Sequence, residues 1–388
     1  MSLSTMRNVV RDYAWGSTDL IAALRGEQPS GRREAEVWMG AHPAAPSAVD
    51  VGGTVVALDQ LVADDPVRVL GAGVHERFGR LPFLMKLLAA AEPLSLQAHP
   101  SIEQAVVGFN RENLAGIALD APHRSYKDDN HKPELICALT PFRALVGFRE
   151  VAASIELLES LRVAELAGVL DVLRSDPSRD DLTGLLRSLL TTDRVAGQAL
   201  AEAVGAAVRS DGPFELERAV ARSIARVHPG DPGIVTALLL NAIELAPGQA
   251  IHLAAGVLHA YVEGLGVEIM ASSDNVLRGG LTPKHIDVDE LCSVVDPTPS
   301  QVVVLEGDDA DGEYVYRTPS PEFELRRLEL DGAVTRSTWG PEIVVVTAGV
   351  VRIDDVPVAA GDSVFIAANS TWKAGGRGQL FRAVVPAG

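Results

Sequence analysis

A block of helical sequence interrupts a chain that is otherwise strand-like, and this interruption constrains the fold more than any other feature. Residues 152–226 are rich in Ala, Leu, Glu and Arg, with leucines at helical spacing such as Leu185, Leu186 and Leu189. Short apolar runs punctuated by Gly and Pro precede the block and return near Asn241, a pattern typical of strands and loops. We therefore expect the two outer segments to fold together around a helical insert.

The expected organisation has three parts. A discontinuous barrel comprises residues 1–150 and 236–297, and the helical insert comprises residues 151–235. Residues 298–388 contain short strand-like runs separated by Gly or Asp turns, a pattern typical of a second small antiparallel barrel. Its expected strands are 301–305, 322–330, 342–346, 350–353 and 363–366. Because residues 300–388 contain no histidine, we expect this second barrel to be metal-free and structural.

Charge and cysteine content exclude several classes of partner and site. The formal net charge of -18 argues against binding to nucleic acid or to an anionic membrane. The two cysteines, Cys137 and Cys292, are not spaced as a CxxC pair, so neither a disulfide framework nor a thiolate metal site is expected. No apolar run is long enough to cross a membrane and the N-terminus does not resemble a secretory signal, so a cytoplasmic location is expected. No feature implies an obligate protein partner.

Two distant stretches place metal-capable side chains at alternating positions. Gln97 and His99 lie two residues apart in the first stretch, as do His259 and Tyr261 in the second. Side chains two residues apart on an extended segment project from the same face, and Pro100 favours extended backbone in the residue before it. Each pair is therefore expected to converge on one point.

Glu134 lies between these stretches and adds a carboxylate to the candidate ligands. Two imidazole nitrogens, one carboxylate oxygen and one amide oxygen form a four-ligand shell for Zn²⁺, with one ion per chain. The expected ligands are Gln97, His99, Glu134 and His259. Structural zinc sites favour cysteine, so this set indicates a catalytic site. The remaining histidines lack metal-ligand spacing and are expected to make ordinary hydrogen bonds.

Six separated stretches carry a resemblance to a known family. They are RDYAWGS (11–17), AEVWMGAHP (35–43), LPFLMKLL (81–88), SLQAHPS (95–101), NHKPELICAL (130–139) and VEIMASSDNVLRGGLTPKHID (267–287). In this order they resemble type I mannose-6-phosphate isomerase over about residues 7 to 295. The resemblance implies cupin-type antiparallel β-barrels of the jelly-roll kind plus an α-helical domain. It also implies zinc bound by the same four residues, and interconversion of mannose 6-phosphate and fructose 6-phosphate.

That reaction requires a group that carries a proton. Conversion of an aldose to a ketose passes through an enediol or enediolate, which bound zinc stabilises as a Lewis acid. Glu268 is a candidate because Val267 and Ile269 would face the opposite side of a strand. Lys132 lies two residues before Glu134, so an extended segment would aim both side chains inward. The sequence leaves open whether Glu268, Lys132 or a metal-bound water removes the C2 proton.

A sugar phosphate also requires cationic donors. Arg278 and Lys284 offer a guanidinium and an ammonium in a segment that contains a glycine pair. The resemblance points to Arg278 as a catalytic or substrate-contacting residue. Further candidates for contact with the phosphate or the sugar are Trp15, Lys86, Ser95 and Tyr261. Core packing explains Trp15 equally well, and Lys86 lies between two apolar residues.

Other functions share parts of this pattern. A non-catalytic cupin that senses or binds sugar phosphates would have the same fold, although the presence of all four candidate ligands and of Arg278 weighs against it. Cupin oxygenases commonly use histidine-rich iron sites, which an amide ligand matches poorly. A fused nucleotidyltransferase is set aside because no Gly-rich nucleotide loop precedes the barrel. The expected ligand is a hexose 6-phosphate.

Overall fold

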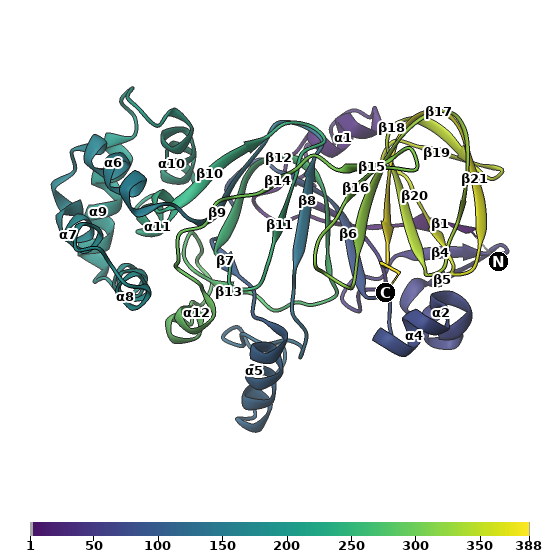
Figure 1. Ribbon diagram of the computed structural model, residues 1–388, viewed down its shortest axis with the longest axis horizontal. Helices are drawn as coiled ribbons and strands as arrows, with labels where there is room; N and C mark the ends of the chain where they lie inside the picture. Colours follow the sequence, from purple (N-terminus) through teal and green to yellow (C-terminus); the bar gives the residue numbers. More distant parts are fainter. Residues whose placement is uncertain (1–2, 388) are drawn as a thin grey trace.

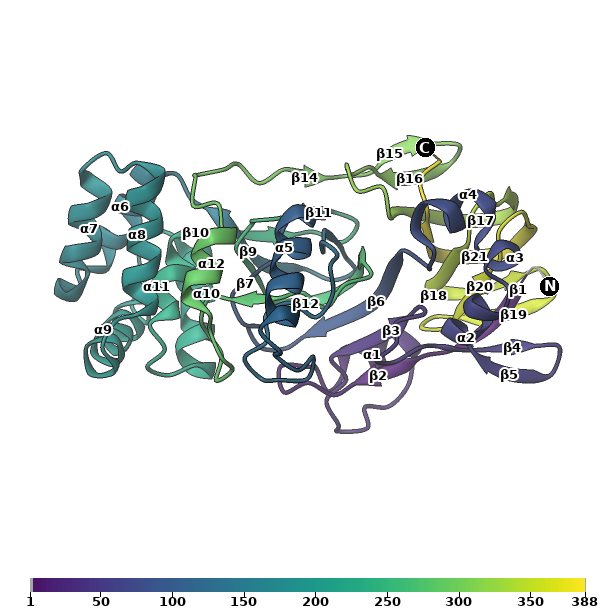
Figure 2. The same ribbon diagram turned by 90° about the horizontal axis from the view of Figure 1, so that it is seen from below.

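The computed structural model describes residues 3–387 and places three bodies in a row (Figure 1). Helices gather at one end, a barrel of strands lies in the middle, and a second group of strands forms the other end. The view turned by 90° shows the same order (Figure 2). The predicted fold class, mainly antiparallel β-sheet with a helical domain, is confirmed. Among the described residues, no helix combines the length and apolar character needed to span a bilayer.

The middle barrel is one sheet of 11 strands. Its strands are β2 (Val9–Arg11), β3 (Glu36–Met39), β6 (Phe83–Ala90), β7 (Gln97–Ala98), β8 (Glu134–Ala138), β9 (Phe142–Phe148), β10 (Leu240–Leu245), β11 (Ala250–Leu253), β12 (His259–Ala271), β13 (Leu277–Arg278) and β14 (Val304–Leu305). β12 is its central strand, since it pairs antiparallel with β6 and β8 along one part and with β7 and β9 along another. A single long strand therefore carries side chains into both halves of the barrel.

The second sheet has 10 strands and includes the beginning of the chain. Its strands are β1 (Leu3–Arg7), β4 (Ala48–Val51), β5 (Thr54–Ala57), β15 (Asp308–Ala310), β16 (Glu313–Tyr316), β17 (Glu324–Ser337), β18 (Glu342–Ile353), β19 (Val356–Ala359), β20 (Ser363–Ile366) and β21 (Thr371–Val384). Leu3 pairs with Ile366, and Met6 pairs with Val49. These pairings differ from the expectation that residues 1–150 belong to the first barrel, because apolar alternation does not specify which sheet edge a strand joins. We propose the three-part division with residues 3–7 and 48–57 transferred to the second barrel.

The C-terminal strands differ from the expected ones at a bulge. β18 is one continuous strand where two were expected, because the Gly at position 349 does not end it. The register shifts between Val346 and Ala348, and Gly349 has a φ of 76°. A Cβ atom at this position would lie 2.5 Å from the carbonyl oxygen of Arg377, so only glycine fits. β21 and the short strands β15, β16 and β19 were not expected.

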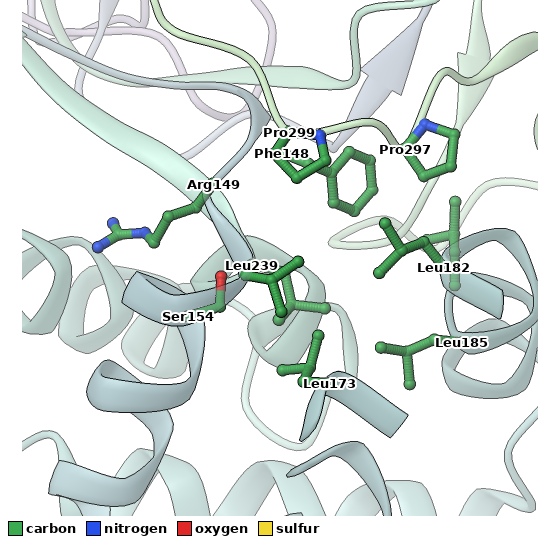
Figure 3. A pocket seen from close by; sticks show the side chains of 11 residues that line it. Phe148, Arg149, Ser154, Leu173, Leu182, Leu185, Leu239, Pro297 and Pro299 are labelled. Carbon is green, nitrogen blue, oxygen red and sulfur yellow. The ribbon is translucent and has the colours of Figure 1, made fainter. Parts of the chain in front are cut away.

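The helical end has a leucine-rich core that meets the barrel at an apolar pocket. Its helices are α6 (Val151–Leu161), the 3₁₀ helix η1 (Ala164–Leu166), α7 (Ala167–Arg174), α8 (Arg179–Leu190), α9 (Arg194–Ala207), α10 (Glu215–Val227) and α11 (Gly233–Leu238). Figure 3 shows Leu173, Leu182 and Leu185 facing Phe148, while the guanidinium of Arg149 points away. The leucine periodicity therefore marks packing positions.

Six other helices of the described residues lie outside the helical insert. They are α1 (Leu20–Arg25), α2 (Leu58–Asp64), α3 (Pro66–Leu70), α4 (Ala72–Phe78), α5 (Ile102–Leu114) and α12 (Val288–Val294). α5 projects from the middle barrel in Figure 1, and it begins with a capping box in which Ser101 and Gln104 bond each other's backbone.

Alternate side chains of the central strands enter two different cores. On β6, Met85 and Leu87 belong to a cluster that includes Phe365 of the second barrel, so this face joins the two barrels. Leu88 instead belongs to a cluster with Tyr261 inside the middle barrel. Lys86 has the same parity as Leu88 and therefore also faces the interior. The interior is apolar at one end of these strands and charged at the other.

Gly266 permits close packing at the apolar end of the interior. A Cβ atom on Gly266 would lie 2.7 Å from Cδ1 of Ile136 and 2.9 Å from the carbonyl oxygen of Cys137. We expect Gly266→Ala to reduce the free energy of unfolding by about 1–3 kcal/mol through overpacking, measured by denaturant titration. Gly184→Ala in α8 is the control, because its Cβ would meet nothing within 4 Å, and it should be neutral or stabilising. Equal stability of Gly266→Ala and the wild type would contradict this packing.

Candidate active site and metal centre

Three buried side chains meet at the charged end of the barrel interior. His99 follows β7, Glu134 begins β8 and His259 begins β12, and their ligand atoms lie within 4.8 Å of one another. Nε2 of His99 lies 3.3 Å from one Glu134 oxygen, and Nε2 of His259 lies 3.5 Å from the other. Both Nε2 atoms and Oε2 of Glu134 are buried without a hydrogen-bond partner among residues 3–387. Such unsatisfied atoms are costly unless a cation occupies the point they face.

Backbone carbonyls fix the orientation of both imidazole rings. Nδ1 of His99 lies 2.7 Å from the carbonyl oxygen of Asn275, and Nδ1 of His259 lies 2.9 Å from that of Val257. A carbonyl can only accept, so each Nδ1 carries the hydrogen and each Nε2 presents a lone pair to the shared point. Burial, followed by the charge of Lys132, lowers the pKa of His99 to about 4, which keeps this ring neutral. The donor set fits a divalent metal ion.

Glu134 is held ionised by its neighbours. Nζ of Lys132 lies 2.8 Å from Oε1 of Glu134. Burial alone would raise the pKa of Glu134, but the charge of Lys132 and the contacts with His99 lower it well below its ordinary value. Lys132 and Glu134 therefore face the same interior, as their spacing predicted.

Gln97 lies beside two other candidate residues. Its backbone is in register with His259 on one side and with Arg278 on the other. Ser95 lies just before this strand, where the neighbouring Leu94 donates to the carbonyl of Tyr261. The structure thus brings Gln97, Ser95 and Arg278 beside β7 and β12, which lead to His99 and His259 of the candidate metal triad (His99, Glu134 and His259).

A cluster of charged side chains, Lys86, Glu268 and Glu36, lies in the barrel interior next to the three candidate metal ligands. Nζ of Lys86 lies 2.8 Å from Glu268 and 3.4 Å from Glu36. Burial raises the pKa of Glu268; Lys86 opposes this, and the net result lies above the ordinary value. Burial alone would lower the pKa of Lys86, but Glu268 and Glu36 raise it above its ordinary range, so the ammonium stays charged. The hydroxyl of Tyr261 is buried, and burial, followed by the charge of Glu268, raises its pKa well above the ordinary value.

Glu36 and Trp38 were not among the expected site residues. The indole Nε1 of Trp38 donates to Glu36 over 2.7 Å, and Lys86 lies 5.4 Å from the centre of the Trp38 ring. Both residues are on β3, which pairs with β6 so that Trp38 is opposite Lys86. Their spacing of two residues was a usable signal for a shared face.

His42 and Asp274 are a further pair that spacing could not identify. They lie 3.3 Å apart although 232 positions separate them in the sequence, and both line a surface pocket of about 520 Å³ between the barrel and α2–α4. Burial alone would raise the pKa of Asp274, but His42, followed by Lys132 and Lys86, lowers it. The two interior lysines therefore influence the carboxyl group of Asp274 at this pocket.

Arg278 and Lys284 are cations without a carboxylate partner in the described part of the chain. Burial lowers the pKa of Arg278, and burial together with the charge of Arg278 lowers the pKa of Lys284. Two neighbouring cations that no protein anion neutralises form a favourable site for an external anion.

Trp15 is placed by packing. It stacks on Tyr13 with ring centres 5.7 Å apart and packs, partly buried, against the apolar cluster that contains Tyr261.

Of the histidines not expected to bind metal, His131 bonds Glu322 over 2.7 Å and His252 lies 3.2 Å from Oγ of Ser320. Both contacts join the middle barrel to the segment before β17.

Comparison with known proteins identifies the family. The family model described as "Phosphomannose isomerase type I, catalytic domain" matches residues 3–151. The chain is 39% identical over 387 residues to the mannose-6-phosphate isomerase of Escherichia coli strain K12, covering 97% of each sequence. The chain belongs to the type I phosphomannose isomerases.

Relatives from distant organisms and a solved structure agree with this assignment. The human mannose-6-phosphate isomerase is 32% identical over 406 residues, covering 93% of this chain and 92% of its own. The mannose 6-phosphate isomerase of Salmonella typhimurium, solved with fructose 6-phosphate and zinc, has a TM-score of 0.91 at 36% identity and covers 100% of both chains. The family predicted from the six motifs is confirmed.

Proposed function

We propose that this phosphomannose isomerase interconverts D-mannose 6-phosphate and D-fructose 6-phosphate with one zinc ion. The observation that carries the proposal is the buried triad of His99, Glu134 and His259, whose unsatisfied ligand atoms face one another beside the Lys86–Glu268 pair. Relatives across the whole chain carry this enzyme name, and the solved relative binds both zinc and fructose 6-phosphate.

We assign the zinc ion to the three triad residues together with Gln97. When bound, zinc acts as a Lewis acid that stabilises negative charge on the substrate oxygens. Glu134 is the single anionic member of this set, so the occupied site keeps a net positive charge. Lys132, bonded to Glu134, orients this carboxylate and places a second cation beside the substrate oxygens.

We assign proton transfer to Glu268. Its pKa lies above the ordinary value for a carboxyl group, and a raised pKa brings a carboxylate closer to the basicity that suits a general base near neutral pH. The ammonium of Lys86 forms an ion pair with Glu268 and fixes its position, and we assign the buried, unsatisfied Tyr261 hydroxyl as a donor to the sugar. Ser95 and Trp15 are assigned to the wall of the substrate site.

We assign the phosphate group to Arg278 and Lys284. Neither side chain has a carboxylate partner among residues 3–387, and a guanidinium binds phosphate with two parallel hydrogen bonds. We infer that a chain with a net charge of -18 binds an anion through these two local cations. The free, buried cysteines are consistent with the proposed cytoplasmic location.

The function is tested by a metal-dependent assay. Protein stripped with a chelator should lose conversion of mannose 6-phosphate by roughly 100-fold or more, because a Lewis acid contributes several kcal/mol to transition-state stabilisation. Added zinc should restore activity in a coupled hexose-phosphate assay, and a mock-treated sample is the control. Zinc-loaded protein that binds hexose phosphate without converting it would instead establish the alternative, a non-catalytic sugar-phosphate sensor.

A further inference from the structure

Asn275 is not one of the three candidate metal ligands, but it contacts His99 and the segment that leads to Glu134. Its backbone carbonyl accepts the hydrogen bond from Nδ1 of His99 over 2.7 Å. Its side chain is turned toward residues 127–130, the segment that leads directly into Lys132 and Glu134. The residue is fully buried, with an exposed fraction of 0%.

The amide of Asn275 uses every hydrogen-bonding position it has. Oδ1 accepts from the backbone N–H groups of Lys127 and Asp128 over 2.7 and 3.3 Å. Nδ2 donates to the carbonyl oxygens of Asp128 and Asn130, each over 2.8 Å. No other side chain of this size offers both acceptor and donor atoms at one end without charge. The Asn275 amide therefore satisfies backbone N–H and C=O groups of the segment 127–130 and fixes its conformation.

Ser273 and Asp128 reinforce the same connection. The hydroxyl of Ser273 donates to the carboxylate of Asp128 over 2.8 Å, and the backbone N–H of Asp274 donates to the other oxygen of that carboxylate, also over 2.8 Å. The Ser273 hydroxyl also accepts from the backbone N–H of Asn275 over 3.2 Å. The loop after β12 and the segment before β8 thus form one hydrogen-bonded network, in which Ser273 and Asn275 are buried.

We propose that Asn275 is a positioning residue for the zinc site. Its backbone carbonyl fixes the ring of His99, and its side chain fixes the segment that leads to Glu134. Partners that orient metal ligands from behind commonly change metal affinity 10- to 100-fold when they are removed. The inference rests on the proposed zinc site and goes beyond it, because it assigns affinity for the ion to a residue that does not touch it.

The test is zinc affinity measured by competition with a chromophoric chelator. Asn275→Asp keeps the shape but turns a carboxylate toward the carbonyl oxygens of Asp128 and Asn130, and we expect zinc affinity to fall about 10- to 100-fold. Ser273→Ala removes one arm of the network and should produce a smaller fall in the same direction. This second variant keeps the proposal testable if Asn275→Asp does not fold.

Asn8→Ala is the matched control. The amide of Asn8 also bridges two segments, because it donates to Ser363 over 2.8 Å and accepts from Ser47 over 2.9 Å, but it lies at the second barrel. Its loss should lower the melting temperature of the metal-free protein and leave zinc affinity unchanged. Wild-type zinc affinity in both Asn275→Asp and Ser273→Ala, or an equal fall in Asn8→Ala, would overturn the proposal. Failure of the wild type itself to bind zinc would instead overturn the proposed function.

Discussion

Glu134→Gln should lose zinc and activity together. The substitution keeps the shape of the side chain but removes the only negative charge among the four assigned ligands. Loss of an outer-shell partner commonly costs 10- to 100-fold in metal affinity, so loss of this direct ligand should cost more than about 100-fold. The change also leaves Lys132 as a buried ammonium without its carboxylate partner, which weakens the site further.

The measurement is the zinc content after dialysis, together with turnover of mannose 6-phosphate at increasing zinc concentration. Glu36→Gln is the control for zinc content, because Glu36 is a buried carboxylate of the same barrel that bonds Trp38 and Lys86 and contacts none of the triad. We expect the control to retain zinc. A Glu134→Gln protein that holds zinc as tightly as the wild type would remove Glu134 from the ligand set.

Arg278→Ala should lower kcat/KM for mannose 6-phosphate by about 100-fold or more. A charge-assisted hydrogen bond contributes about 1.5–3 kcal/mol, and a guanidinium can donate two of them to one phosphate. If Arg278 binds the phosphate equally in the ground state and the transition state, the loss appears as a higher KM. If the contact strengthens in the transition state, kcat falls as well.

Steady-state kinetics separate these cases, and two further variants sharpen the result. Arg278→Lys keeps the charge without the paired donors and should recover part of the loss. Arg143→Ala removes an exposed guanidinium that is already paired with Glu244 and should leave the kinetics unchanged. Near-normal kcat/KM in Arg278→Ala would exclude Arg278 from substrate binding and catalysis.

The sequence predicted His99 and His259 as candidate metal ligands because each alternates with a second polar side chain on a short extended segment, while Glu134 was added from the segment between them. The spacing of Gln97 and His99, with Pro100 after them, specified a strand and one of its faces. The same argument placed Glu268 opposite to Val267 and Ile269, which pack in the core between the barrels. Glu36 and Trp38 obeyed this rule too, although nothing in their own segment indicated a partner.

The residues that the sequence did not indicate all depend on contacts between distant segments. Asn275 meets residues 127–130 because β12 ends beside the start of β8. Asp274 meets His42 because β3 and β12 both pair with β6 and end beside its first residues. The pairing of β1 with β20 has the same character, since an edge strand offers its hydrogen bonds to any edge that the fold brings to it.

The sequence by itself determined the helical insert, the strand-rich character of both flanks, the charged face of β6, β8 and β12, and the family. Each of these follows from local periodicity or from a short motif, so it can be predicted without knowing which distant segments pack together. Only the tertiary structure decided which sheet the first strands join and which buried groups surround the metal ligands. Those contacts link residues far apart in the chain, and their energy is set by the closeness of atoms in space, which residue spacing along the chain does not encode.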